Sequence, residues 1–76
     1  MAVEVTSPSN TGIKIKDKVA AYLAGGARLV WVLNPKRRQI RVHRTNGTTS
    51  ALSGDDRLDG EDLLPGFSVP VNELFT

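Results

Sequence analysis

Glu4 lies in apolar surroundings, where a charge is costly and could serve catalysis. It is flanked by Val3 and Val5 in a β-rich stretch over residues 2–6. An ionised carboxylate inside a sheet is expensive unless a cation or several hydrogen-bond donors meet it. Glu4 is therefore either a site residue with a cationic partner or an edge glutamate that faces solvent.

A lysine from the next predicted element could be that partner. Residues 13–24 have helical periodicity, and their apolar stripe consists of Ile15, Val19, Tyr22 and Leu23. Lys16 and Lys18 each lie about 80° from the centre of this stripe, on opposite flanks. Either ammonium could extend along the packed face toward the sheet. Helix geometry alone leaves both open, beside the alternative that both lysines are solvated.

A run of basic residues forms the main positive feature of the chain. Its members are Lys36, Arg37, Arg38, Arg41 and Arg44. Arg37 and Arg38 follow Pro35 in a predicted turn, and Arg41 is on the polar side of a predicted strand, so these three arginines could contact nucleic-acid phosphates. The alternative is a solvated hairpin neutralised by the acidic tail, because six of the eight Asp and Glu residues follow residue 54.

Composition excludes several classes of site. The chain has 76 residues, 39% of them hydrophobic and 24% charged, which fits one small globular domain. Without cysteine it has no disulfide, thiolate zinc site or Cys–His dyad. The single histidine, His43, is expected on the solvated side of a strand. The longest apolar run covers only residues 29–33, so a transmembrane helix is excluded. With no basic region at the N-terminus to suggest a secretory signal, a cytoplasmic protein is expected.

The order of predicted elements indicates an α+β domain. A strand over residues 2–6 and a turn over residues 7–12 precede the helix, which Gly25-Gly26 ends. A buried strand follows over residues 29–33, then a hairpin of strands 39–44 and 48–52, whose Asn46-Gly47 pair favours a type I′ turn. Two short extended pieces, 56–58 and 67–69, and a helical turn over 71–75 complete the chain. We expect a small mixed sheet, with a parallel strand–helix–strand unit followed by the antiparallel hairpin, and one main helix packed on it.

Four short motifs in this order resemble a known family. They are Val3-Glu4-Val5-Thr6-Ser7-Pro8-Ser9, Lys18 with Tyr22-Leu23-Ala24-Gly25-Gly26, Leu29-Val30-Trp31-Val32-Leu33-Asn34-Pro35, and Leu64-Pro65-Gly66-Phe67. Together they resemble the C-terminal half of the restriction-endonuclease family that has the PD-(D/E)XK nuclease fold. The resemblance covers almost the whole chain.

The resemblance implies Mg²⁺-dependent DNA cleavage, with Glu4 and Lys18 as catalytic residues and Glu4 as a metal ligand. It also favours Lys18 over Lys16. In such nucleases a metal-binding Asp comes from an earlier strand, and residues 1–76 are expected to be a single truncated domain without that Asp. One carboxylate binds Mg²⁺ poorly. We therefore expect a fragment or remnant of a DNA endonuclease that is inactive alone.

The second reading is a non-enzymatic module that dimerises or binds nucleic acid. The strand over residues 2–6 is expected at an open sheet edge with apolar flanks, which favours pairing with a second chain. A homodimer is therefore expected, with DNA as a further partner through Arg37, Arg38 and Arg41, and with no membrane and no small-molecule cofactor.

Overall fold

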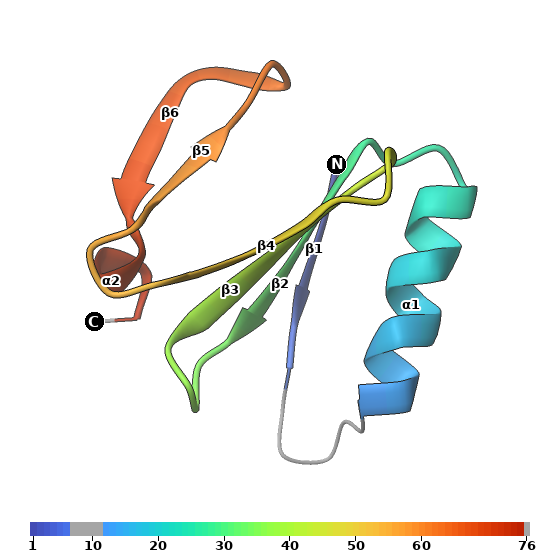
Figure 1. Ribbon diagram of the computed structural model, residues 1–76, viewed down its shortest axis with the longest axis horizontal. Coiled ribbons are helices and arrows are strands. Elements are labelled where there is room, and N and C mark those ends of the chain that lie inside the picture. The colour runs from blue at the N-terminus through green and yellow to red at the C-terminus, as the bar shows by residue number, and fades with distance from the viewer. Residues whose placement is uncertain (7–11, 76) are drawn as a thin grey trace.

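The computed structural model describes residues 1–6 and 12–75 of the chain. Figure 1 shows the elements, which in chain order are β1 (Ala2–Val5), α1 (Gly12–Ala24), β2 (Leu29–Asn34), β3 (Gln39–Arg44), β4 (Thr49–Ser53), β5 (Arg57–Gly60), β6 (Leu64–Pro70) and α2 (Val71–Leu74). Most of the turn predicted over residues 7–12 lies outside the described residues. Neither described helix is long and apolar enough to cross a membrane.

The main sheet has four strands in the order β1-β2-β3-β4. β1 is parallel to β2, whereas β2, β3 and β4 pair antiparallel. The mixed sheet of the predicted α+β class is thus confirmed. In Figure 1, α1 and the β5–β6 hairpin lie on opposite sides of this sheet.

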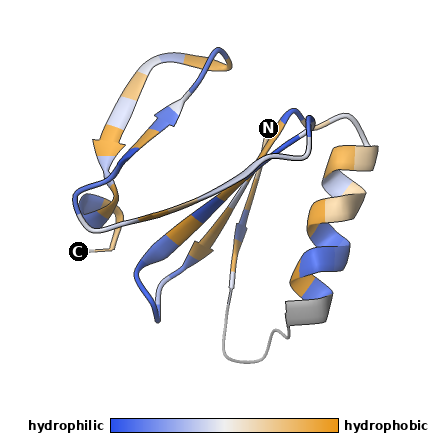
Figure 2. Ribbon diagram, in the orientation of Figure 1, coloured by the Kyte–Doolittle hydropathy of each residue, from blue (hydrophilic) through white to orange (hydrophobic). Residues whose placement is uncertain are grey.

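The two faces of the sheet are covered by different elements, as the continuous apolar run of β2 predicts. On one face, Val19 of α1 packs with Val30 and Val32, and Ile15 and Leu23 lie partly buried beside them. On the opposite face a larger core contains Leu29, Trp31, Ile40, Val42, Leu58 and Val71. β3 alternates between hydrophobic and hydrophilic residues (Figure 2), so its apolar side faces this larger core.

The C-terminal segment differs most from the prediction. The extended pieces expected at 56–58 and 67–69 are longer, and as β5 and β6 they pair with each other in an antiparallel hairpin with an irregularity between Asp59 and Gly60. Gly60, Pro65 and Gly66 favour only short extended pieces in this segment, and the pairing of these pieces was not predicted. Glycine and proline are tolerated in a short two-stranded ribbon because every strand in it is an edge strand.

The turn between β3 and β4 also differs from the predicted type I′ turn. Gly47 has a positive φ of 88°, but Asn46 is not among the residues with positive φ. The Gly47 N–H donates to the Arg44 carbonyl at 3.0 Å, and the Asn46 side chain accepts from the Thr48 N–H at 2.9 Å. The loop is therefore a three-residue connection with Gly47 in the left-handed position. The Asn46 side chain stabilises this alternative by bonding to the backbone two residues on.

Candidate active site

Glu4, Lys18 and Tyr22 form a polar cluster between β1 and α1. The Lys18 Nζ donates to Glu4 Oε1 at 2.9 Å, and the Tyr22 hydroxyl donates to Glu4 Oε2 at 3.0 Å. Alternation along β1 directs Glu4 toward α1 and turns Val3 and Val5 to the other face. Lys18 and Tyr22 are four residues apart, so successive turns of α1 present them on the same flank. Both oxygens of Glu4 are therefore held by α1.

The contacts fix the charge state of the cluster. The Glu4 side chain is only 16% exposed, against 49% for Lys18. Hydrogen bonds from Lys18 and then from Tyr22 lower the pKa of Glu4, despite a smaller opposing effect of desolvation. The same carboxylate raises the pKa of Lys18 and that of Tyr22. At neutral pH the cluster is a carboxylate, an ammonium and a neutral phenol.

The structure brings together the two predicted catalytic residues, although they are 14 positions apart. It assigns the contact to Lys18, whose Nζ lies 2.9 Å from Glu4 Oε1. The sequence prediction missed Tyr22, which it placed in the apolar stripe. Tyr22 is 37% exposed, and its hydroxyl is part of the cluster. The signal in the sequence was its spacing of four residues from Lys18, which places both side chains on the same flank of a helix.

The described residues do not fit a Mg²⁺ site by themselves. No group of three or more His, Asp or Glu side chains in the described part of the chain is arranged to hold a metal ion. Glu4 is the single carboxylate of the cluster, and both of its oxygens already accept hydrogen bonds. Mg²⁺ requires near-octahedral oxygen coordination, so a second acidic group or substrate phosphates would be needed.

Comparison with known proteins identifies the family. The family model described as "Putative restriction endonuclease" matches residues 1–72. The chain belongs to this restriction-endonuclease family. The comparison with curated proteins finds no match.

A crystal structure of a putative nuclease from Anabaena variabilis has a similar fold, with a TM-score of 0.85 and 19% sequence identity. The similarity covers 96% of this chain but only 41% of that protein, so the present chain spans about two fifths of its structural neighbour. At this identity the neighbour supports the fold. The family membership comes from the family model and the Glu4–Lys18 contact comes from this structure, so neither depends on the neighbour.

The three arginines predicted to contact nucleic acid have different surroundings in the structure. Arg38 lies in the β2–β3 turn with a positive φ of 52°, and its guanidinium donates to the Phe75 carbonyl at 3.2 Å. Arg37, in the same turn, is exposed, and its backbone N–H donates to the Asn34 side chain at 3.2 Å. Arg41 is exposed on the face that α1 covers elsewhere, beside Val32 and Ala51. Arg37 and Arg41 therefore remain candidates, whereas Arg38 is engaged at the C-terminal segment.

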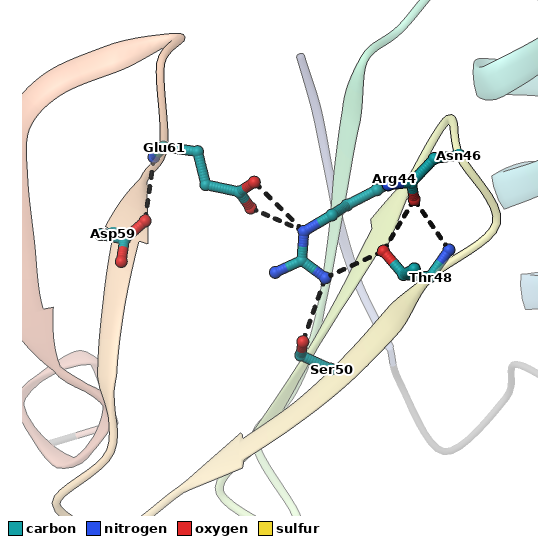
Figure 3. Close-up of polar contacts among 6 residues, drawn as sticks. All are labelled: Arg44, Asn46, Thr48, Ser50, Asp59 and Glu61. Atoms are coloured by element: carbon teal, nitrogen blue, oxygen red, sulfur yellow. Dashed lines mark hydrogen bonds and ion pairs between the residues drawn. The ribbon is translucent and has the colours of Figure 1, made fainter.

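The acidic tail neutralises only part of the basic half. Arg44 donates through Nε to both carboxylate oxygens of Glu61, at 2.9 and 3.1 Å, and through Nη1 to the Ser50 hydroxyl at 3.0 Å (Figure 3). Arg28 pairs with Asp62. The Arg44 contacts join β3 and β4 to the loop after β5, so Arg44 serves to hold the hairpin against the sheet.

His43 should make stability depend on pH. It is half-buried, and burial together with the charge of Arg41 lowers its pKa. The unfolded chain then binds a proton more readily than the folded one, so the stability present above pH of about 6.5 is lost as pH falls toward the folded-state pKa. Urea unfolding from pH 7.5 to 5 should show this loss for the natural chain and a smaller loss for His43→Gln. Equal pH dependence of the two proteins would contradict the assignment.

Proposed function

We propose that this chain carries the Glu4–Lys18 part of a Mg²⁺-dependent DNA endonuclease site of the PD-(D/E)XK type and does not cleave DNA by itself. The observation that supports this proposal is the 2.9 Å contact between a strand carboxylate and a helix lysine in a member of the restriction-endonuclease family. The two residues come from different elements, and the contact leaves about half of the Lys18 side chain exposed to solvent.

The chemistry available to the cluster is electrostatic. The Lys18 ammonium could stabilise the negative charge that develops on a phosphate during hydrolysis. Tyr22 keeps the second oxygen of Glu4 in a fixed orientation. The single carboxylate does not complete a metal site, and its hydrogen bonds lower its pKa, so it is a weaker base than an ordinary glutamate. Lys18 and Tyr22 have raised pKa values and stay protonated at neutral pH, so no group of the cluster is suited to activate water. The proposed inactivity follows from this deficit of acidic ligands.

A cleavage assay tests the proposal. The chain and its Glu4→Ala variant should both leave supercoiled plasmid DNA intact in Mg²⁺ or Mn²⁺, with residual nicking equal in the two proteins. Glu4→Ala is the control because it removes the carboxylate while leaving the surrounding strand and its valines unchanged. Metal-dependent nicking by the natural chain that disappears in Glu4→Ala would contradict the proposed inactivity.

A second candidate function is nucleic-acid binding without cleavage. On the α1 side, the exposed part of β3 and β4 carries Arg41 and His43 among hydroxyl and amide side chains, and neither strand contains Asp or Glu. Two carboxylates of the acidic tail, Glu61 and Asp62, form ion pairs with Arg44 and Arg28 and not with Arg37 or Arg41. A phosphate backbone could therefore approach Arg41 and Arg37 without meeting an acidic side chain from these two strands.

A further inference from the structure

The Asn46-Gly47 pair in the β3–β4 turn is a chemically labile sequence. The backbone nitrogen of the residue after an asparagine can attack the side-chain Cγ, and glycine at that position has no side chain to obstruct the attack. Both residues are exposed. Apart from its two chain neighbours, no atom of the described residues lies within 4 Å of the place that a Cβ would take at Gly47. The pair is therefore accessible to water and to the base that this reaction needs.

The folded turn restrains both reacting groups. The Gly47 N–H donates to the Arg44 carbonyl at 3.0 Å. The Asn46 Oδ1 accepts from the Thr48 N–H at 2.9 Å and from the Thr48 hydroxyl at 2.7 Å (Figure 3). Attack requires the Gly47 nitrogen to lose its proton and to turn the face of its peptide plane toward Cγ. The first bond holds that proton and the other two hold the side-chain amide, so all three oppose the reaction.

We propose that Asn46 is a site of spontaneous deamidation that the hydrogen bonds of the β3–β4 turn hold in check, so that modification follows opening of this turn. In the opened turn the Gly47 nitrogen bonds to Asn46 Cγ. The C–N bond of the side-chain amide breaks, and ammonia leaves with the proton of the Gly47 nitrogen. Water then opens the resulting succinimide ring at either carbonyl, which gives aspartate or isoaspartate. Water is the only co-reactant.

Deamidation would place a new charge beside the residue that joins the sheet to the hairpin. The Thr48 hydroxyl donates to Asn46 Oδ1 and accepts from Arg44 Nη1 at 3.5 Å, so the new carboxylate would lie one side chain away from Arg44. Arg44 also binds Glu61, and a second carboxylate would compete for the same guanidinium. The isoaspartyl form also adds a backbone carbon to the three-residue loop. We therefore expect the isoaspartyl chain to unfold at a lower urea concentration than the natural chain, and equal midpoints would contradict this consequence.

Mass spectrometry of the full chain tests the proposal. At mildly alkaline pH we expect a gain of about one dalton in the tryptic peptide 45–57. The gain should be at least about tenfold faster in denaturing urea than in buffer, because each restraining hydrogen bond contributes roughly two- to tenfold. The other asparagines are internal controls. They precede Thr11, Pro35 and Glu73, of which proline has no N–H and the other two have side chains that obstruct the attack. Equal rates in urea and buffer, or first modification at another asparagine, would overturn the proposal.

Thr48→Val tests whether the turn itself provides the protection. It removes the hydroxyl that donates to Asn46 Oδ1 and keeps a β-branched side chain of the same shape. We expect deamidation to be about two- to tenfold faster in buffer, which is the equilibrium value of one hydrogen bond, and unchanged in urea. Thr45→Val is the matched control, because the Asn46 amide oxygen bonds to Thr48 and not to Thr45, and it should leave both rates unchanged. A rate in buffer no higher for Thr48→Val than for the natural chain would overturn the proposed protection. These readouts involve neither DNA nor metal, so they are independent of the cleavage assay.

Discussion

Leu58→Ala is expected to lower the free energy of unfolding by about 2–5 kcal/mol. Leu58 is only 1% exposed and belongs to the core formed by Trp31, Ile40 and Val42 on the side of the sheet opposite α1. Its truncation removes apolar contacts and leaves a cavity between β5 and the sheet. A domain of this size has a total stability of roughly 4–11 kcal/mol, so much of the population could unfold. Urea denaturation followed by circular dichroism measures the change.

Leu64→Ala is the matched control for this experiment. Leu64 belongs to the same hairpin but is 37% exposed, so its truncation should change stability by no more than about 0.5 kcal/mol. If the two variants were equally stable, Leu58 would not be the main apolar contact of the hairpin. If Leu58→Ala does not fold, Leu58→Met provides a milder change of similar volume, with an expected cost below about 1.5 kcal/mol.

Combined substitution of Arg37 and Arg41 by alanine is expected to weaken duplex DNA binding by about tenfold or more at low salt. Both side chains are exposed, and each could neutralise one phosphate. The slope of log K against log salt should fall by about 2, because each lost phosphate contact removes roughly one unit. Fluorescence anisotropy with a labelled duplex at several salt concentrations gives the affinity and the slope.

The control for this variant is the combined substitution of Arg28 and Arg57 by alanine. It changes the net charge equally, but Arg28 pairs with Asp62, and Arg57 donates to Ser68 at 2.9 Å. It should leave the salt slope nearly unchanged. Equal losses for the two double variants would show that net charge governs binding, and absence of binding by the natural chain would exclude the nucleic-acid module.

The parts of the site that were predictable depend on local patterns in the sequence. A charged residue within an apolar strand singled out Glu4, and helical spacing reduced its possible partners to Lys16 and Lys18. The choice of Lys18 came from the family resemblance, because the two lysines are symmetric about the apolar stripe. The structure removes this symmetry: β1 lies on one side of β2 only, so only one flank of α1 faces Glu4.

Other features were not predictable because they depend on tertiary contacts. Tyr22 has an apolar ring and a polar hydroxyl. Its position in the helical apolar stripe predicts that the ring packs, but it does not predict the hydrogen bond of the hydroxyl. Arg38 was grouped with Arg37, but its backbone conformation and its contact with Phe75 separate the two side chains. The β5–β6 pairing joins segments rich in glycine and proline, and local propensity cannot anticipate that Leu58 anchors it to the sheet.

Trp31 gives this fold a built-in optical reporter. It is the only tryptophan of the chain, it is 6% exposed, and its ring centroid is 5.7 Å from that of Phe67 on β6. The indole therefore lies at the junction between the four-stranded sheet and the hairpin. Any separation of the hairpin would hydrate it and shift its fluorescence emission to longer wavelengths, even while the sheet and α1 keep their circular dichroism. Comparing the two signals during unfolding would show, without any label, whether the two sheets melt together.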